Sequence, residues 1–165
     1  NSLQIDRILL LLASTTTQCG DLTSQQFGNA IYGLQNLWNS EALHSLLKAL
    51  LPKMRSCEAV SVQAIGNSCF GLQSLRNSTE VNSIIACLAE MAEHIVLGNQ
   101  AIANSLYGLQ CIEDCPEVRR LIHAISFSLS KLREPLKAQE VAMAFYGLRS
   151  IDVTSMEIQC LLQAL

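Results

Sequence analysis

Charged side chains are scarce in this chain. They make up 15% of its 165 residues and sum to a net charge of −3 at pH 7. Because Lys and Arg supply most of the affinity for phosphate, this composition excludes a protein that holds nucleic acid by bulk electrostatics. Long apolar runs are also missing, since the most apolar stretch, Ile8 to Ala13, is far shorter than the roughly 20 residues that cross a bilayer. The sequence therefore predicts a soluble protein.

Motifs of catalysis are missing as well. The sequence has no phosphate-cradling glycine loop, no HExxH pair and no nucleophile elbow, so we expect a protein that is not an enzyme. It also has no signal peptide and no amphipathic Arg-rich leader before its first repeat. Any targeting segment is therefore expected to be removed or to lie outside this sequence.

The seven cysteines do not follow a disulfide pattern. Their number is odd and their spacing irregular, which favours a reducing compartment. Cys111, Cys115 and His123 can be drawn as three zinc ligands, but the second Cys-x-x-Cys-type pair of a structural zinc site is missing. We therefore expect free thiols, no metal and no cofactor.

One short phrase occurs four times in the chain. Its copies are FGNAIYGLQNL (27–37), IGNSCFGLQSL (65–75), IANSLYGLQCI (102–112) and VAMAFYGLRSI (141–151). The glycines of the copies, Gly33, Gly71, Gly108 and Gly147, are separated by 38, 37 and 39 residues. This period is typical of helix-pair solenoids, so the sequence predicts an all-α fold: a right-handed α-solenoid of stacked helix-turn-helix repeats in one domain.

Each repeat is predicted to contain two helices. Apolar residues at i, i+4 and i+7 around each glycine indicate a first helix, expected over 24–37, 62–75, 99–112 and 138–151. Breaks rich in Ser, Thr and Asp follow at 39–40, 77–79, 114–116 and 152–155, where a second helix is expected to begin. The predicted units are the second helix of a preceding repeat (1–23), three repeats (24–61, 62–98, 99–137) and a truncated fourth (138–165). Because neither end looks like a polar cap, we expect a piece of a longer array, or ends that partners cover.

The anchor glycine is unusual inside a helix, where it costs about 1 kcal/mol relative to alanine. Small residues also stand five positions before it, at Gly28, Gly66, Ala103 and Ala142. Close approach of neighbouring helices explains such residues, and we favour this explanation. The alternative is that a side chain at the glycine would block the path of a ligand along the surface.

Polar and aromatic residues recur at fixed distances from the glycine, which predicts rows across the stacked first helices. The rows are Gln25, Gln63, Gln100 and Gln139 eight positions before it; Asn29, Asn67 and Asn104 four before, with Met143 in the last copy; Tyr32, Phe70, Tyr107 and Tyr146 one before; and Asn36, Ser74, Cys111 and Ser150 three after. A further variable set stands seven before: Gln26, Ala64, Ala101 and Glu140.

These rows have two interpretations. In one, the amides bond to base edges and the aromatics stack on bases of a single-stranded RNA. In the other, the amides form ladders between repeats and the aromatics fill grooves. A residue that reads different bases should vary, so the constant Gln row favours a ladder, the variable positions favour readers, and the Asn row fits both.

Basic residues are nearly missing from the first helices, where Arg149 stands alone. A second group lies on the second helices and the loops after them, and it includes five candidates for a phosphate-binding rim: Lys53, Arg55, Lys131, Arg133 and Lys137. The alternative, which we favour, is that these charges form only a solvated face. If they converge on the Asn row, RNA is favoured; if they point away and the groove is apolar, a protein partner is favoured.

The NxxYGLQ-like core with a period of 37–39 residues resembles the octotricopeptide and heptatricopeptide repeat families. Met143 and Arg149 depart from the pattern in the last copy. The resemblance implies an organellar RNA-binding protein of the mitochondrion, or alternatively of the plastid or cytoplasm, in RNA metabolism or in a ribonucleoprotein such as a ribosome. It also implies that Asn29, Asn67 and Asn104 match the polar contact position of those families. The alternative function is a scaffold that holds a peptide or a neighbouring protein subunit in the same groove.

Overall fold

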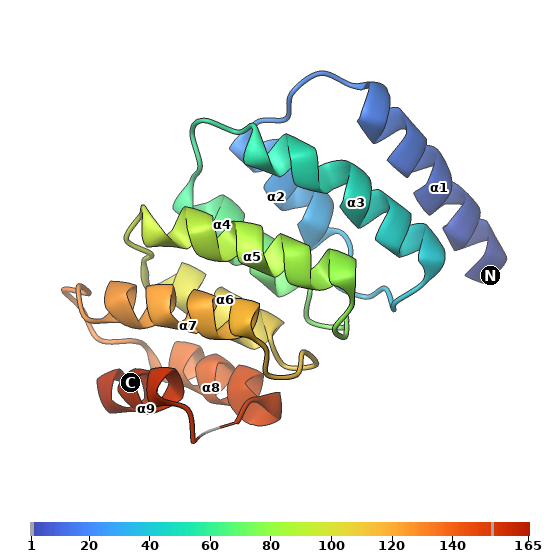
Figure 1. Cartoon of the computed structure of the whole chain (residues 1–165). Coiled ribbons are helices and arrows are strands. Elements are labelled where there is room, and N and C mark those ends of the chain that lie inside the picture. Colours follow the sequence, from blue (N-terminus) through green and yellow to red (C-terminus); the bar gives the residue numbers. More distant parts are fainter. Residues whose placement is uncertain (1, 153) are drawn as a thin grey trace.

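The computed structural model describes residues 2–152 and 154–165, and this part of the chain folds into helices joined by loops, with no strand (Figure 1). The elements are α1 (Ser2–Gln18), α2 (Ser24–Tyr32), α3 (Glu41–Arg55), α4 (Val62–Gly71), α5 (Thr79–Glu93), α6 (Asn99–Gly108), α7 (Pro116–Leu129), α8 (Ala138–Gly147), the short 3₁₀ helix η1 (Leu148–Ser150) and α9 (Met156–Ala164). The predicted all-α class is confirmed.

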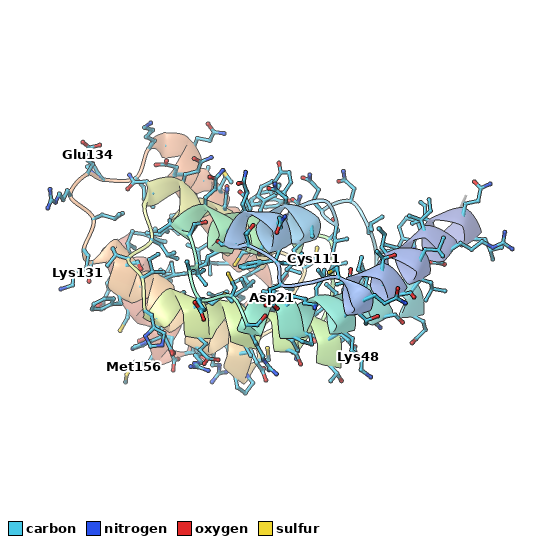
Figure 2. The ribbon with its side chains drawn as sticks, turned by 90° about the horizontal axis from the view of Figure 1, so that it is seen from above. Asp21, Lys48, Cys111, Lys131, Glu134 and Met156 are labelled. Atoms are coloured by element: carbon cyan, nitrogen blue, oxygen red, sulfur yellow. The ribbon has the colours of Figure 1, made fainter. Side chains whose placement is uncertain are left out.

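The helices pack in two layers. The helices α2, α4, α6 and α8 form one layer, called here the first-helix layer, and α1, α3, α5, α7 and α9 form the second-helix layer. Figure 2 shows the two layers from above. Each helix packs most extensively against the helix two further along the chain, and α4 also contacts α5 as α6 contacts α7. A nearly continuous apolar core of buried Leu, Ile, Val and Ala side chains fills the space between the layers.

The helices begin where the sequence predicts. The first helices begin at residues 24, 62, 99 and 138. The hydroxyls of Ser40, Ser78 and Ser155 each accept a hydrogen bond from the backbone N–H three residues on, at 3.2 to 3.4 Å, and Pro116 opens α7. These contacts satisfy amide groups that a helix leaves unpaired at its start. Residue 153 of the fourth predicted break lies outside the described residues.

The predicted ends of the first helices are wrong. These helices end at Tyr32 or at the anchor glycine, whereas the expected ends were 37, 75, 112 and 151. After the glycine the backbone tightens into bonds between residues three apart, as from Leu34 N–H to the Ile31 carbonyl (2.9 Å) and from Leu37 N–H to the Leu34 carbonyl (2.8 Å). The apolar pattern continues through these turns because Leu72 and its equivalents stay buried, which made the helices look longer.

The anchor glycines mark close contact between neighbouring first helices. A Cβ at Gly71 would overlap the carbonyl of Ile31, and Gly108 and Gly147 face the carbonyls of Cys69 and Leu106 in the same way. A Cβ at Gly28 would lie 3.0 Å from the Cα of Ala64, and one at Gly66 only 2.9 Å from the Cα of Ala101. The explanation by close helix approach is therefore confirmed at these positions.

One buried hydroxyl offers a test of this packing. The side chain of Ser68 is fully buried between first helices and its hydroxyl has no hydrogen-bond partner, while alanine stands at the equivalent positions 30 and 144. A buried hydroxyl without a partner lowers stability, so we expect Ser68→Ala to raise the free energy of unfolding by about 1 kcal/mol in a urea titration. Ser78→Ala, which removes an N-cap, should lower it by about 1 kcal/mol. A loss of stability in both variants would contradict the assignment.

Candidate binding surface

The first-helix layer presents a repeated face to solvent. On each of its helices the Gln, Asn and aromatic positions are four and three residues apart, which places them on one stripe. The Gln row (Gln25, Gln63, Gln100, Gln139) is exposed, and the Asn row (Asn29, Asn67, Asn104) is exposed or half-buried. These seven residues are called here the amide rows.

The side chains of the amide rows form no hydrogen bond with another residue in the described part of the chain. Other asparagines of the repeat do. Asn39 donates to the Arg76 carbonyl (3.0 Å) and accepts from the Arg76 N–H (2.8 Å), and Asn77 makes the same pair of bonds with Glu113. The amide rows are therefore free to bond to a ligand, whereas Asn39 and Asn77 join successive repeats.

The prediction that the Gln row forms a ladder is wrong, because a different glutamine forms it. Gln73 donates to the side chain of Gln35 (3.3 Å) and Gln110 donates to that of Gln73 (3.2 Å). Arg149 takes the fourth position and donates to the Gln110 carbonyl (3.2 Å). These residues are the Gln of each GLQ, so the sequence contained the signal, but the analysis followed the glutamines on the exposed face.

Three hollows lie along the amide rows, one between each pair of neighbouring first helices. Their volumes are about 500 Å³ between α2 and α4, 480 Å³ between α4 and α6, and 350 Å³ between α6 and α8. Each is lined by the Gln-row residues of both helices and by the Asn row, with Met143 replacing Asn on α8. The small residues Gly28, Gly66 and Ala103 line them too, so the amides flank a repeated opening that small residues keep clear.

The four aromatics form a continuous column beside the amide rows. Successive ring centroids from Tyr32 through Phe70 and Tyr107 to Tyr146 are 5.6, 5.4 and 5.6 Å apart, with interplanar angles of 17° to 22°. The guanidinium of Arg149 lies 4.3 Å from the centroid of the Tyr146 ring and closes one end. A base about 3.4 Å thick cannot enter between rings that already stack. The column therefore packs the repeats together, and only its edges remain for a ligand.

The variable positions are mostly engaged within the protein. Three residues after the glycine, the hydroxyls of Ser74 and Ser150 donate to the carbonyls of Gln35 (2.6 Å) and Gln110 (2.7 Å) in the preceding repeat. Cys111 lies 3.8 Å from a guanidinium nitrogen of Arg149. Asn36 alone is exposed with no hydrogen bond among the described residues.

The set seven positions before the glycine is likewise used locally. The side chain of Gln26 accepts from the Thr23 N–H (2.9 Å), and Glu140 accepts from the Lys137 N–H (2.7 Å), so both cap their helices. Ala64 and Ala101 are buried against neighbouring helices. The repeat-to-repeat variation that suggested base reading at these positions has a structural origin.

The basic residues proposed as a rim do not converge on the amide rows. The ammonium of Lys53 donates to the Cys19 carbonyl (2.7 Å), and Arg55 lines a different hollow between α3 and α5. Lys131, at the edge of the molecule in Figure 2, lies 5.2 Å from the centroid of the Phe127 ring. Arg133 is exposed in the same loop. Among the five candidates only Lys137 lines one of the three hollows, the one between α6 and α8.

Further basic side chains are paired on the second-helix layer. Arg119 bonds to Asp114 and Arg120 to Glu93, each at 2.6 Å, and the Arg120 guanidinium holds the pKa of the Glu93 carboxyl below its usual value. Exposed pairs of this kind contribute little to stability. They do leave the first-helix layer close to neutral, so its chemistry is that of amides.

The cysteines are free thiols at scattered places. Burial raises the pKa of Cys69 to about 12 and also raises the pKa of Cys87 and of Cys115, so these three stay protonated at neutral pH. In residues 2–152 and 154–165 no group of three His, Cys, Asp or Glu side chains is placed to hold a metal ion. Over the same residues no helix is long and apolar enough to span a membrane.

No family model, curated protein or solved structure matches this chain. The resemblance to octotricopeptide and heptatricopeptide repeats therefore stays a prediction. The chemistry of the amide rows is what remains to indicate a function.

Proposed function

We propose that the first-helix layer binds single-stranded RNA, with the amide rows as its contact groups. The observation that carries this proposal is that seven amides, at equivalent places on successive helices, have no partner within the described chain and line three adjacent hollows. An amide offers both a donor and an acceptor, which suits the edges of unpaired bases, and RNA is recognised with sequence preference mainly where its bases are unpaired.

The charge distribution defines the kind of RNA binding. With Lys137 as the one proposed rim residue at the hollows, phosphate contacts contribute little, and affinity comes from base edges and the polar lining. Each phosphate contact with a single strand contributes a slope of about −0.7 to log K against log salt. We therefore expect a slope near −1 or shallower, in contrast to proteins that bind through basic grooves.

A second candidate function is a scaffold that holds an extended peptide or a neighbouring protein subunit. The observation that favours it is the direction of the basic residues, since Lys53, Arg55 and Lys131 all lie away from the amide rows. A peptide main chain also presents alternating donors and acceptors that amides can match. The polar lining of the hollows favours RNA over an apolar partner surface.

The wider setting follows from the family resemblance. We propose that the two layers are part of a right-handed α-solenoid with a repeat of about 38 residues, the geometry of helix-pair arrays. The period of the aromatic column and the Gln35–Gln73–Gln110 ladder supports this. By the same resemblance, the protein acts in a mitochondrial ribonucleoprotein rather than as an enzyme.

The test is RNA affinity measured by fluorescence anisotropy with a random single-stranded pool across a salt series. The triple variant Asn29→Ala, Asn67→Ala, Asn104→Ala should bind more than about tenfold more weakly, because three hydrogen bonds of about 0.5 to 1.5 kcal/mol are lost. The matched control, Gln4→Ala with Gln159→Ala, removes exposed amides from the second-helix layer and should bind as the unmodified protein does. No binding at low salt, or equal binding by both variants, would contradict the proposal.

A further inference from the structure

The helix α2 has an open side that its equivalents use for packing. The residue three positions before the anchor glycine is fully buried in α4 (Ser68), α6 (Ser105) and α8 (Ala144), each of which has a first helix before it. In α2 the same position is Ala30, which is exposed, and Gly33 is exposed too. A Cβ at Gly33 would meet only the carbonyls of its own helix, the nearest at 3.4 Å. The notch that receives a neighbouring backbone is thus present on α2 and empty.

The neighbouring helix α1 exposes apolar side chains that face no partner. Ile8, Leu11 and Leu12 are 57%, 69% and 49% exposed. The residues 38 positions later in α3, Leu46, Ala49 and Leu50, are only 5%, 9% and 2% exposed. The same repeat position is therefore covered in α3 and bare in α1, which stands at one end of the stack (Figure 1). Apolar surface of this size and continuity marks an interaction site.

Two of the inter-repeat ladders also end openly at this place. Tyr32 is 39% exposed and stacks on Phe70 alone, whereas Phe70 and Tyr107 each have a ring on both sides. The side chain of Gln35 accepts from Gln73 and has no further glutamine to which it could donate in the described chain. Notch, ring and amide are the three features through which first helices bind one another elsewhere in the molecule.

We propose that the corner formed by α1 and α2 binds one additional helix of the first-helix kind, supplied by a partner polypeptide. Its recognition features are those of the internal interface: a backbone carbonyl against Gly33, an aromatic ring stacked on Tyr32, and apolar side chains on Ile8, Leu11 and Leu12. A first helix packs on the next first helix and also touches its own second helix, as α4 does with α6 and α5. A helix in this corner makes the same two contacts, with α2 and α1.

The occupant is a single helix and not a second copy of this chain. A second copy would have to offer α8, whose far side is open, since Phe145 is 53% exposed where the equivalent residues of the other first helices are buried. The helix α9 accompanies α8 in the second-helix layer. Placing α8 of a copy beside α2 would bring its α9 into the space that α1 already fills. A lone amphipathic helix meets no such obstacle.

The probe for this site is a fluorescein-labelled peptide of residues 23–39, the segment that packs against α4 within the molecule. A lactam between Gln25→Glu and Asn29→Lys, both on the exposed face, holds it helical without altering the packing side. We expect saturable binding to the full chain by fluorescence anisotropy. Gly33→Leu in the full chain fills the notch and should weaken binding at least tenfold, and Leu11→Glu should do the same.

The stability of the variants separates docking from folding. Because Gly33 is exposed, Gly33→Leu should leave the thermal unfolding midpoint of the full chain unchanged, as should the control Gln159→Ala, which should also bind the peptide normally. No saturable binding, or equal binding by Gly33→Leu, would overturn the proposal. Dimerisation of the unmodified chain in sedimentation velocity that Gly33→Leu abolishes would overturn it too, since it would identify a second copy as the occupant.

Discussion

Gly108→Ala is expected to lower the free energy of unfolding by about 3 kcal/mol, near the upper end of what overpacking a tight interface costs. The Cβ of alanine would overlap the Cys69 carbonyl, which belongs to the backbone of α4 and cannot rotate away. The helices α4 and α6 must then move apart, and this disturbs the ring contact between Phe70 and Tyr107 and the bond between Gln73 and Gln110. Denaturant titration followed by circular dichroism measures the loss.

Gly33→Ala is the matched control for this substitution. Gly33 occupies the same repeat position, but the added Cβ meets no neighbouring helix. Because alanine favours helical backbone, this variant should be unchanged or more stable by up to about 1 kcal/mol. Equal destabilisation at both positions would show that the glycine is needed for its own helix, and would contradict the packing account.

Tyr107→Ala should be nearly as damaging, with a loss of about 3 kcal/mol. The ring stacks on Phe70 on one side and on Tyr146 on the other, at 5.4 and 5.6 Å between centroids. Each such contact contributes about 0.5 to 1.5 kcal/mol beyond the apolar area it buries. Removing the ring interrupts the column at its centre, so the third and fourth repeats lose contact with the second. Thermal or urea unfolding of the variant measures this.

Two further variants show whether stacking is the cause. Tyr107→Phe keeps the ring and should unfold like the unmodified protein, since phenylalanine stands in the column at position 70. Tyr32→Ala, at the open end, removes one ring contact and should lose roughly half as much. If Tyr32→Ala and Tyr107→Ala cost the same, the position in the column is irrelevant and mutual stacking does not hold the repeats together.

Much of the fold was predictable because it depends on short-range patterns. The helix starts follow from the caps at Ser40, Ser78 and Ser155, and the first-helix register follows from apolar spacing around each glycine. The helix ends were missed because the apolar stripe continues into tight turns. A stripe reports which side is buried, and it does not report whether the backbone bonds span three or four residues.

The candidate site was predictable only in part. The Asn row was identified from its repetition and lies on the exposed face, with Asn67 and Asn104 lining the hollows. The roles of the two glutamine rows were exchanged, because a constant residue can be constant for packing or for binding and the sequence does not show which side chain meets a partner. The readers expected at Gln26, Glu140, Ser74 and Ser150 are caps and inter-repeat bonds in the structure.

The tight stacking also determines the geometry of the amide rows. Because each anchor glycine brings the next helix against a carbonyl, the repeats follow one another at nearly constant spacing, as the ring distances of 5.4 to 5.6 Å show. Equivalent amides therefore recur regularly along the layer. A ligand with a regular backbone can place successive units against successive hollows, which is the form of recognition proposed for RNA.

The most direct test of that claim is a titration of the ¹⁵N-labelled protein with single-stranded RNA, observed through the side-chain NH₂ resonances in ¹H–¹⁵N spectra. We predict saturable shifts for Asn29, Asn67 and Asn104 and for the Gln row, with Asn39 and Gln159 unchanged. The hydrogen-bonded ladder glutamines Gln73 and Gln110 should shift little. Shifts confined to the second-helix layer, or no shifts at RNA excess, would contradict the assignment of the first-helix layer as the RNA-binding surface.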